Sequence, residues 1–240
     1  MVTMYHWDLP QRLQELGGWT NPEIIDLFAD YAQVLITHFG DRVKFWSTFN
    51  EPLQTCLASY NYDQMAPAIN YPGIPNYLCA HNLLKAHAEV YHMYKAMNQT
   101  GQIGIVTDTA WYEPKTNSTD DQLASEQALQ FIFGWYMHPI LSETGNYPPV
   151  MIERIDRLSR DQGFSKSRLP KFTPAEIARI KGTGDYLAFN HYSTSFVEFN
   201  DNNKANYSVP SQEHDMNKID SKDPNWPQAA SSWLQVCAIV

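Results

Sequence analysis

Residues 43–54, VKFWSTFNEPLQ, run from an alternating apolar segment directly into two polar side chains and a proline. Residues 43–49 have the pattern of a buried β-strand, and Asn50, Glu51 and Pro52 stand where that strand ends. A carboxylate is costly to bury unless it is paired or used. Taken alone, such a glutamate is more often a helix N-terminal carboxylate than a catalyst, so its surroundings in the sequence decide its interpretation.

Predicted strands alternate with predicted helices on both sides of this stretch. The strands are 2–6, 43–49, 103–107 and 185–192, and the helices are 21–40, 77–98, 118–137, 149–158 and 173–181. Such alternation favours parallel βαβ units. No glycine-rich phosphate loop follows a strand, which argues against a dinucleotide-binding fold. Residues 193–232 are polar and rich in Asn, Ser, Asp and Pro, and are predicted to form a long loop.

Polar side chains follow every predicted strand. They are His6, the pair Asn50-Glu51, Asp108, and the segment from Asn190 to Tyr192. In a (βα)8 barrel the catalytic groups lie at the carboxyl ends of the strands. The sequence therefore predicts an α/β fold of the TIM-barrel type, with Glu51 at the end of the sheet where an active site would lie.

Strand parity predicts which of these side chains share a face, because alternate residues of a strand point to opposite sides. In strand 185–192 the set that would face the barrel interior ends with Asn190 and Tyr192. The opposite set, predicted to lie under helices, is Leu187, Phe189 and His191. Asn50 and Glu51 fall on opposite faces of their strand. Both can reach one site only if the regular pleat breaks at the strand end.

The composition excludes several classes of partner. The 240 residues are 43% hydrophobic and 18% charged, as is typical of a globular domain with a sizeable core. The formal net charge is −9 and Lys and Arg form no cluster, so nucleic acid is not expected to bind. No apolar run approaches the length of a membrane span. The aromatic content of 13% suits stacking on sugar rings as well as core packing.

Neither a metal nor a cofactor is expected. Cys56, Cys79 and Cys237 are too few and too scattered for a disulfide scaffold or a zinc site. Cys56 and Cys79 could form a pair, but their spacing leaves this open. The three histidines of the predicted helix 77–98 are interpreted as structural, because their spacing does not suit a pair of metal ligands; they are His81, His87 and His92.

Three further side chains also have structural interpretations. Trp111 and Trp233 could line a binding site, but core packing is the preferred interpretation. Asp108 could simply cap the segment that follows its strand.

Five motifs in order along the chain resemble glycoside hydrolase family 1. They are YHWDLPQ (5–11), STFNEP (47–52), GWYMHPI with GNYP (134–140 and 145–148), GDYLAFNHYS (184–193) and DPNWPQAASSW (223–233). The resemblance covers residues 1–235 and is nearest to animal, in particular insect, β-glucosidases and lactase-phlorizin-like proteins. It implies a partial (βα)8 barrel in which the four predicted strands are about the third to the sixth.

The resemblance implies a retaining β-glycosidase, in which two carboxyl groups about 5 Å apart act across the glycosidic bond. Its substrate would be a small β-glycoside or an oligosaccharide. Glu51 matches the family's acid/base catalyst. Asn50 would bind the sugar 2-hydroxyl and His6 another ring hydroxyl, while Trp7 would shape the wall of the sugar site.

Asn190 and Tyr192 match the family's N-x-Y motif, whose tyrosine hydroxyl would hold the nucleophilic carboxylate in place. The nucleophile motif itself, T-E-N-G, does not occur in the chain, and neither do the Gln and Glu that precede YHW in the family. We therefore interpret residues 1–240 as one incomplete (βα)8 domain that carries the acid/base half of the site. We expect the chain alone to lack significant hydrolytic activity. A homodimer could complete the barrel without supplying the nucleophile.

Other functions are compatible with parts of the pattern. The alternatives are a vestigial or truncated sugar-binding protein, a thioglucosidase, and, as the weakest, a nucleotide-dependent oxidoreductase on a doubly wound sheet. Plant thioglucosidases of the family have glutamine at the position of Glu51, so O-glycosides are the expected substrates. Sequons at Asn98, Asn117 and Asn206 fit a secreted, digestive or lysosome-like protein, although MVTMYHWDLP is no signal peptide.

Overall fold

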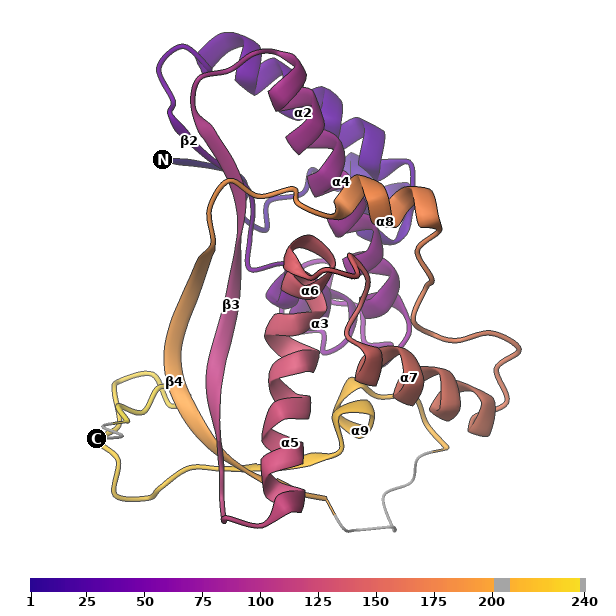
Figure 1. Ribbon diagram of the computed structural model, residues 1–240, viewed down its shortest axis with the longest axis vertical. Coiled ribbons are helices and arrows are strands. Elements are labelled where there is room, and N and C mark those ends of the chain that lie inside the picture. The colour runs from indigo at the N-terminus through magenta and orange to yellow at the C-terminus, as the bar shows by residue number, and fades with distance from the viewer. Residues whose placement is uncertain (201–207, 238–240) are drawn as a thin grey trace.

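The computed structural model describes residues 1–200 and 208–237. Within them the chain forms a five-stranded sheet in the order β1-β2-β3-β4-β5. The strands are Val2–Tyr5, Phe45–Asn50, Gln102–Pro114, Ala188–Phe199 and Lys218–Ser221. Strands β1 to β4 are parallel, and β5 is antiparallel to β4. Figure 1 shows β3 and β4 as long neighbours with the helices to one side of them. The predicted α/β class with parallel βαβ units is confirmed.

Helices connect the parallel strands. In chain order the described ones are α1 (Gln11–Glu15), the 3₁₀ turn η1 (Gly18–Thr20), α2 (Ile24–Phe39), α3 (Pro52–Tyr60), α4 (Pro75–Ala96), α5 (Thr119–Leu129), the π turn η2 (Gln130–Gly134), α6 (Trp135–Leu141), α7 (Pro149–Asp161), α8 (Pro174–Ile180) and α9 (Gln212–Met216). The cap predicted at Thr173 is present as a capping box with Glu176. The predicted helix 118–137 is instead three pieces, because its backbone widens into a π turn.

The prediction of a long loop over 193–232 is wrong in part. Residues 193–199 continue β4, and α9 and β5 follow, while 201–207 lie outside the described residues. The extension is polar yet regular because its backbone pairs on both sides. Trp111 to Pro114 of β3 align with Thr194 to Val197, and Phe196 to Phe199 pair with β5.

The apolar core joins the strand ends to α2 and α4. Phe49 is fully buried, and its ring stacks on Phe28 of α2 at 4.5 Å between ring centroids. The Trp19 ring meets the edge of Phe49 at 5.2 Å. By contrast, Leu187 and Phe189, predicted to lie under helices, stay 53% and 51% exposed. That face of the sheet is covered by helices only in part.

Helix α3 was not predicted from the sequence, although it directly follows Glu51. Pro52 occupies its first turn, and nearly every side chain of the helix is buried, so it lacks the one-sided pattern that marks an amphipathic helix. A disulfide between Cys56 and Cys79, whose Cα atoms are 5.6 Å apart, joins α3 to α4. The pairing that spacing left open is therefore present, and Cys237 is a free thiol.

Among the described residues, no helix combines the length and apolarity that a membrane crossing needs.

Candidate active site

The chain leaves the regular pleat just before Glu51. The pairing of β2 with β3 shifts register between Ser47 and Asn50, and the Ser47 hydroxyl donates to the carbonyl of Phe49 at 2.9 Å. Glu51 then has a φ of 48°, in the left-handed region that residues other than glycine rarely adopt. Its N–H still donates to the carbonyl of Val106 on β3 at 2.8 Å. The predicted break at the strand end is therefore present, and it brings Asn50 and Glu51 to one site.

The carboxylate of Glu51 is held by two donors from β4. The amide of Asn190 donates to Glu51 Oε1 at 2.5 Å, and the hydroxyl of Tyr192 donates to the same oxygen at 3.1 Å. Glu51 is only 5% exposed. Asn190 and Tyr192 thus share a face directed at Glu51, as parity predicted. In the described residues the Tyr192 hydroxyl has the Glu51 carboxylate as its acceptor; its expected contact with the family's nucleophile stays a prediction, because the T-E-N-G motif does not occur in these 240 residues.

A series of contacts links the ends of β1 and β2 to the residues that hold the Glu51 carboxylate. Asn190 Nδ2 also donates to Asn50 Oδ1 at 3.2 Å, and Asn50 Nδ2 lies 3.1 Å from His6 Nε2. The indole N–H of Trp7 donates to the Asn50 carbonyl at 3.1 Å. The six side chains singled out in the sequence therefore gather where β1 and β2 end and in the first half of β4.

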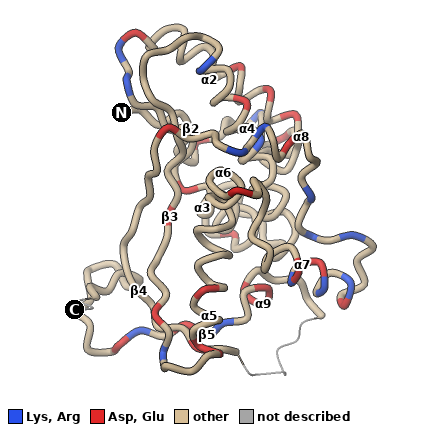
Figure 2. Tube along the Cα trace, in the orientation of Figure 1, with Lys and Arg blue, Asp and Glu red and all other residues tan. Residues whose placement is uncertain are grey.

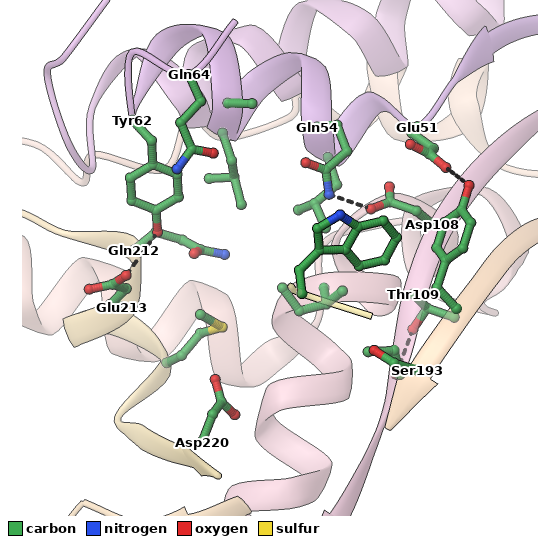
Figure 3. Close-up of a pocket in the computed structure, with 18 of the residues that line it drawn as sticks. Glu51, Gln54, Tyr62, Gln64, Asp108, Thr109, Ser193, Gln212, Glu213 and Asp220 are labelled. Carbon is green, nitrogen blue, oxygen red and sulfur yellow. Dashed lines mark hydrogen bonds between the residues drawn. The ribbon is translucent and has the colours of Figure 1, made fainter. Parts of the chain in front are cut away.

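These polar contacts border a cavity of about 880 Å³, a size typical of small-molecule sites. Figure 3 shows Glu51, Gln54 and Asp108 together at one end, and Tyr62, Gln212 and Glu213 together at the other. The wall between them includes the apolar side chains Leu53, Leu57, Ala58, Ile132 and Met216. The cavity is therefore polar at both ends and apolar between them.

Asp108 lines this cavity and does not cap the next segment, so the structural interpretation was wrong. It lies within β3, is 6% exposed, and accepts a hydrogen bond on Oδ2 from Gln54 Nε2 at 2.8 Å. Burial, together with the negative charge of Glu51, raises the pKa of the Asp108 carboxyl to about 7. The sequence signal that could have found it is its place on the strand next to the one that ends in Glu51.

The two tryptophans assigned to the core are not in it. Trp233 is 56% exposed, lines the cavity and forms a T-shaped contact with the Tyr192 ring at 5.5 Å between centroids. Trp111 is 47% exposed, and its indole N–H donates to Glu113 at 2.7 Å. Trp233 therefore lines the cavity, the alternative that the sequence analysis ranked below core packing, because it lies in an irregular polar segment that carries no periodic pattern.

The far wall of the cavity is anchored by a buried ion pair. Both guanidinium nitrogens Nη1 and Nη2 of Arg168 contact the Asp215 carboxylate, at 2.9 and 2.6 Å, and the Tyr77 hydroxyl donates to it at 2.6 Å. Asp215 lies on α9, which also carries Gln212. The Gln212 side chain is 1% exposed, and neither atom of its amide has a partner within the described structure.

The histidines of α4 have structural contacts. His87 lies between the Thr48 hydroxyl, at 2.8 Å, and the Thr183 carbonyl, at 2.5 Å. His81 Nδ1 is 3.1 Å from the Tyr147 hydroxyl. Burial lowers the pKa of both imidazoles to about 4, so both are neutral at ordinary pH. In the described residues, no group of three or more metal-ligating side chains is assembled.

Fold and site together define an α/β protein with a nearly buried carboxyl group at the end of a parallel strand and a cavity of ligand size beside it. The sequence profile described as "Glycosyl hydrolase family 1" matches residues 1–239, and the chain belongs to this family. Its sheet is accordingly part of a (βα)8 barrel.

Individual relatives agree with this assignment. The chain is 43% identical to Myrosinase 1 of the aphid Brevicoryne brassicae, over 94% of this chain and 48% of the aphid protein. It is 42% identical to human lactase/phlorizin hydrolase, over 98% of this chain and 12% of that protein. A crystal structure of a rice β-glucosidase superposes with a TM-score of 0.89 at 33% identity, over 98% of this chain and 51% of the rice chain. The chain thus spans about half the length of the aphid relative.

Proposed function

We propose that this protein, at its natural length, is a retaining β-glycosidase of the β-glucosidase type that hydrolyses terminal β-O-glycosides. The observation that carries the proposal is Glu51, a nearly buried carboxyl group that lies at the end of β2 and borders a cavity of ligand size. Membership of the family supports the reaction class. The substrates are small β-glycosides or oligosaccharides, which the polar ends and apolar middle of the cavity suit.

Glu51 acts as the acid/base catalyst. Both of its donors contact Oε1, which leaves Oε2 as the oxygen that gives a proton to the glycosidic oxygen and later takes one from water. Retaining hydrolysis also needs a nucleophilic carboxylate about 5 Å away. The T-E-N-G motif does not occur in these 240 residues, so the proposal concerns the protein at its natural length.

The surrounding side chains bind the sugar. Asn50 binds the 2-hydroxyl, a contact that strengthens in the transition state of such reactions. His6 binds a neighbouring hydroxyl, and the contact between Asn50 and His6 fixes both side chains. Trp7 forms part of the wall beside them.

The test is hydrolysis of nitrophenyl β-glucoside by the purified protein at its natural length, with nitrophenyl α-glucoside as the control substrate. We expect cleavage of the β-anomer with retention of configuration, followed by NMR of the first product. A folded protein that binds β-glucosides but cleaves none would instead be a sugar-binding protein and would refute the proposal.

A second candidate, a thioglucosidase-type activity, is supported by the 43% identity to the aphid protein named Myrosinase 1. We rank it below O-glycoside hydrolysis because Glu51 supplies the proton that an oxygen leaving group needs. Comparable rates on an O-glucoside and a glucosinolate would reverse this order.

We also propose that the protein matures in an oxidising, secretory compartment. The Cys56–Cys79 disulfide supports this, since such bonds persist mainly in secreted proteins. The sequon residues Asn98 and Asn117 are both exposed, as glycosylation requires, whereas Asn206 lies outside the described residues. A shift of electrophoretic mobility on removal of N-glycans tests the proposal.

A further inference from the structure

The strand β2 contains one extra residue directly before Asn50. Between Ser47 and Asn50 it advances by three residues, while β3 advances by two, from Gly104 to Val106. Such a bulge turns the residues that follow it toward the opposite face of the sheet and re-aims their side chains. The bulge brings Asn50 and Glu51 to one site, so the position of these two side chains depends on what holds it.

Thr48, inside the bulge, is bonded to a histidine of α4. Its hydroxyl lies 2.8 Å from Nδ1 of His87, and both side chains are fully buried. His87 Nε2 lies 2.5 Å from the carbonyl of Thr183, in the segment between α8 and β4. One imidazole therefore joins the bulge to α4 and to the segment that leads into β4, the strand that supplies both donors to Glu51.

These contacts determine which nitrogen of His87 carries the proton. The Thr183 carbonyl can only accept, so Nε2 donates to it. Burial lowers the pKa of the imidazole to about 4, so the ring is neutral and Nδ1 is an acceptor. The Thr48 hydroxyl therefore donates to Nδ1. Its distance to the Gly104 carbonyl is 3.4 Å, so the imidazole is the nearer of its two acceptors.

Few charged groups surround His87. In the described structure, the groups that act on its pKa are the Thr183 carbonyl and His92, and no carboxylate is among them. Strand β2 contains no charged residue. The charged residues of α4, which Figure 2 shows, are Lys85, Glu89 and Lys95. Glu89 forms an ion pair with Arg179. The neutral ring is therefore the form that holds the bulge.

Two other contacts of the bulge differ in kind from this bond. The Ser47 hydroxyl donates to the Phe49 carbonyl within β2 itself. The Phe49 ring packs on Phe28 of α2, and apolar packing has no preferred direction. A hydrogen bond does have one. The bond between Thr48 and His87 therefore fixes how the bulge is oriented relative to α4.

We propose that His87 is a positioning residue for the glycosidase reaction: it holds the β2 bulge from α4 and so keeps Glu51 where it can protonate the glycosidic oxygen. The inference rests on the proposed function, because it assigns His87 an effect on that proton transfer. A displaced Glu51 slows substrates with poor leaving groups most, since those need the proton. A protein that is merely less stable would instead lose activity on all substrates alike.

The test compares methyl β-glucoside, whose leaving group needs a proton, with dinitrophenyl β-glucoside, whose leaving group does not. The readout is the ratio of the two kcat/KM values for the protein at its natural length, in which any loss of folded protein cancels. Thr48→Val removes the hydroxyl and should lower this ratio about 10–100-fold, because a displacement of 1 Å can cost about 10²-fold. Thr48→Ser retains the hydroxyl and should keep the wild-type ratio.

Histidine variants assign the effect to the bond. His87→Gln should also lower the ratio. His81→Gln is the matched control, because His81 lies buried on the same helix with a pKa of about 4 but contacts Tyr147 instead of β2. It should leave the ratio unchanged even where it lowers Tm. Thr48→Val combined with His87→Gln should be no worse than the more impaired single variant, because both changes remove one bond.

Three results would overturn the inference: an unmoved ratio in Thr48→Val, an equal fall in His81→Gln, or additive losses in the double variant. These results are distinct from a failure of the proposed function. A wild-type protein that cleaves neither glucoside would refute the proposed function and this inference together. Cleavage of both glucosides, with an unmoved ratio in Thr48→Val, would refute this inference alone.

Discussion

Tyr192 and Glu51 are joined by a hydrogen bond that crosses the sheet. The hydroxyl of Tyr192, on β4, donates to Oε1 of Glu51, at the end of β2, at 3.1 Å, and β3 lies between the two strands. Burial and the charge of Glu51 raise the pKa of the Tyr192 hydroxyl, so it remains a donor. The position of the carboxyl group thus depends on a strand that follows it by more than a hundred residues in sequence.

The first prediction concerns the loss of the Tyr192 hydroxyl. Tyr192→Phe should lower kcat about tenfold and change KM little, because one hydrogen bond contributes about 0.5–1.5 kcal/mol and Asn190 still holds Glu51. The control is Tyr186→Phe, whose hydroxyl donates to the Trp46 carbonyl instead. Equal losses in the two variants would show that the Tyr192 hydroxyl acts only on folding.

The second prediction concerns the proton donor. Glu51→Gln should slow hydrolysis of alkyl β-glucosides by about 10²–10⁴-fold, because general acid catalysis contributes that much when the leaving group is poor. Dinitrophenyl β-glucoside needs no proton and should show a far smaller loss in its first step. The basic limb of the pH profile should flatten. Equal losses on both kinds of substrate would assign Glu51 a structural role.

The third prediction concerns the far end of the cavity. The buried amide of Gln212 has no partner in the described structure, and we expect it to bind hydroxyls of a long, polar substrate. Gln212→Leu should raise KM for cello-oligosaccharides about tenfold, the effect of losing one or two hydrogen bonds, and leave nitrophenyl β-glucoside unaffected. Gln122→Leu, on exposed surface, is the control. A similar rise in KM for both substrates would exclude this recognition.

The fourth prediction concerns the anchor of α9. Asp215→Asn should lower the free energy of unfolding by about 3–5 kcal/mol, since it leaves the buried Arg168 guanidinium without its counter-charge. Glu198→Gln breaks the partly exposed pair with Lys115 and should cost less than about 1 kcal/mol. Urea unfolding of both variants gives the comparison, and equal costs would refute a special role for the buried pair.

Much of the site could be predicted from the sequence, because its residues lie on strands or directly after them. Period-two alternation places Asn190 and Tyr192 on one face, and both reach Glu51. The need for a broken pleat at Asn50 follows from the same parity, and the register shift confirms it.

The rest depends on contacts between segments far apart in sequence. From the sequence alone Asp108 could be a cap, and only the pairing of β3 with β4 shows that it aligns with Asn190. Trp233 lines the cavity but lies in a segment that has no periodic pattern to predict its position. Helix α3 is buried on all sides and so shows no one-sided pattern. The late strand β5 is stabilised by pairing with β4 rather than by its own sequence, KIDS.

The two sides of the cavity differ in how firmly their side chains are held in place. Helix α3, which begins at the residue after Glu51 and carries Gln54, is bonded covalently to α4, so we expect this side of the cavity to move little. Trp233, on the other side, is more than half exposed, and its ring is perpendicular to the Tyr192 ring that it contacts. We expect leaving groups of different width to be accommodated by rotation of the Trp233 side chain, with helix α3 unchanged. Under the proposed function, we expect tolerance toward different leaving groups to depend on the Trp233 wall and the placement of the proposed proton donor to depend on the α3 wall.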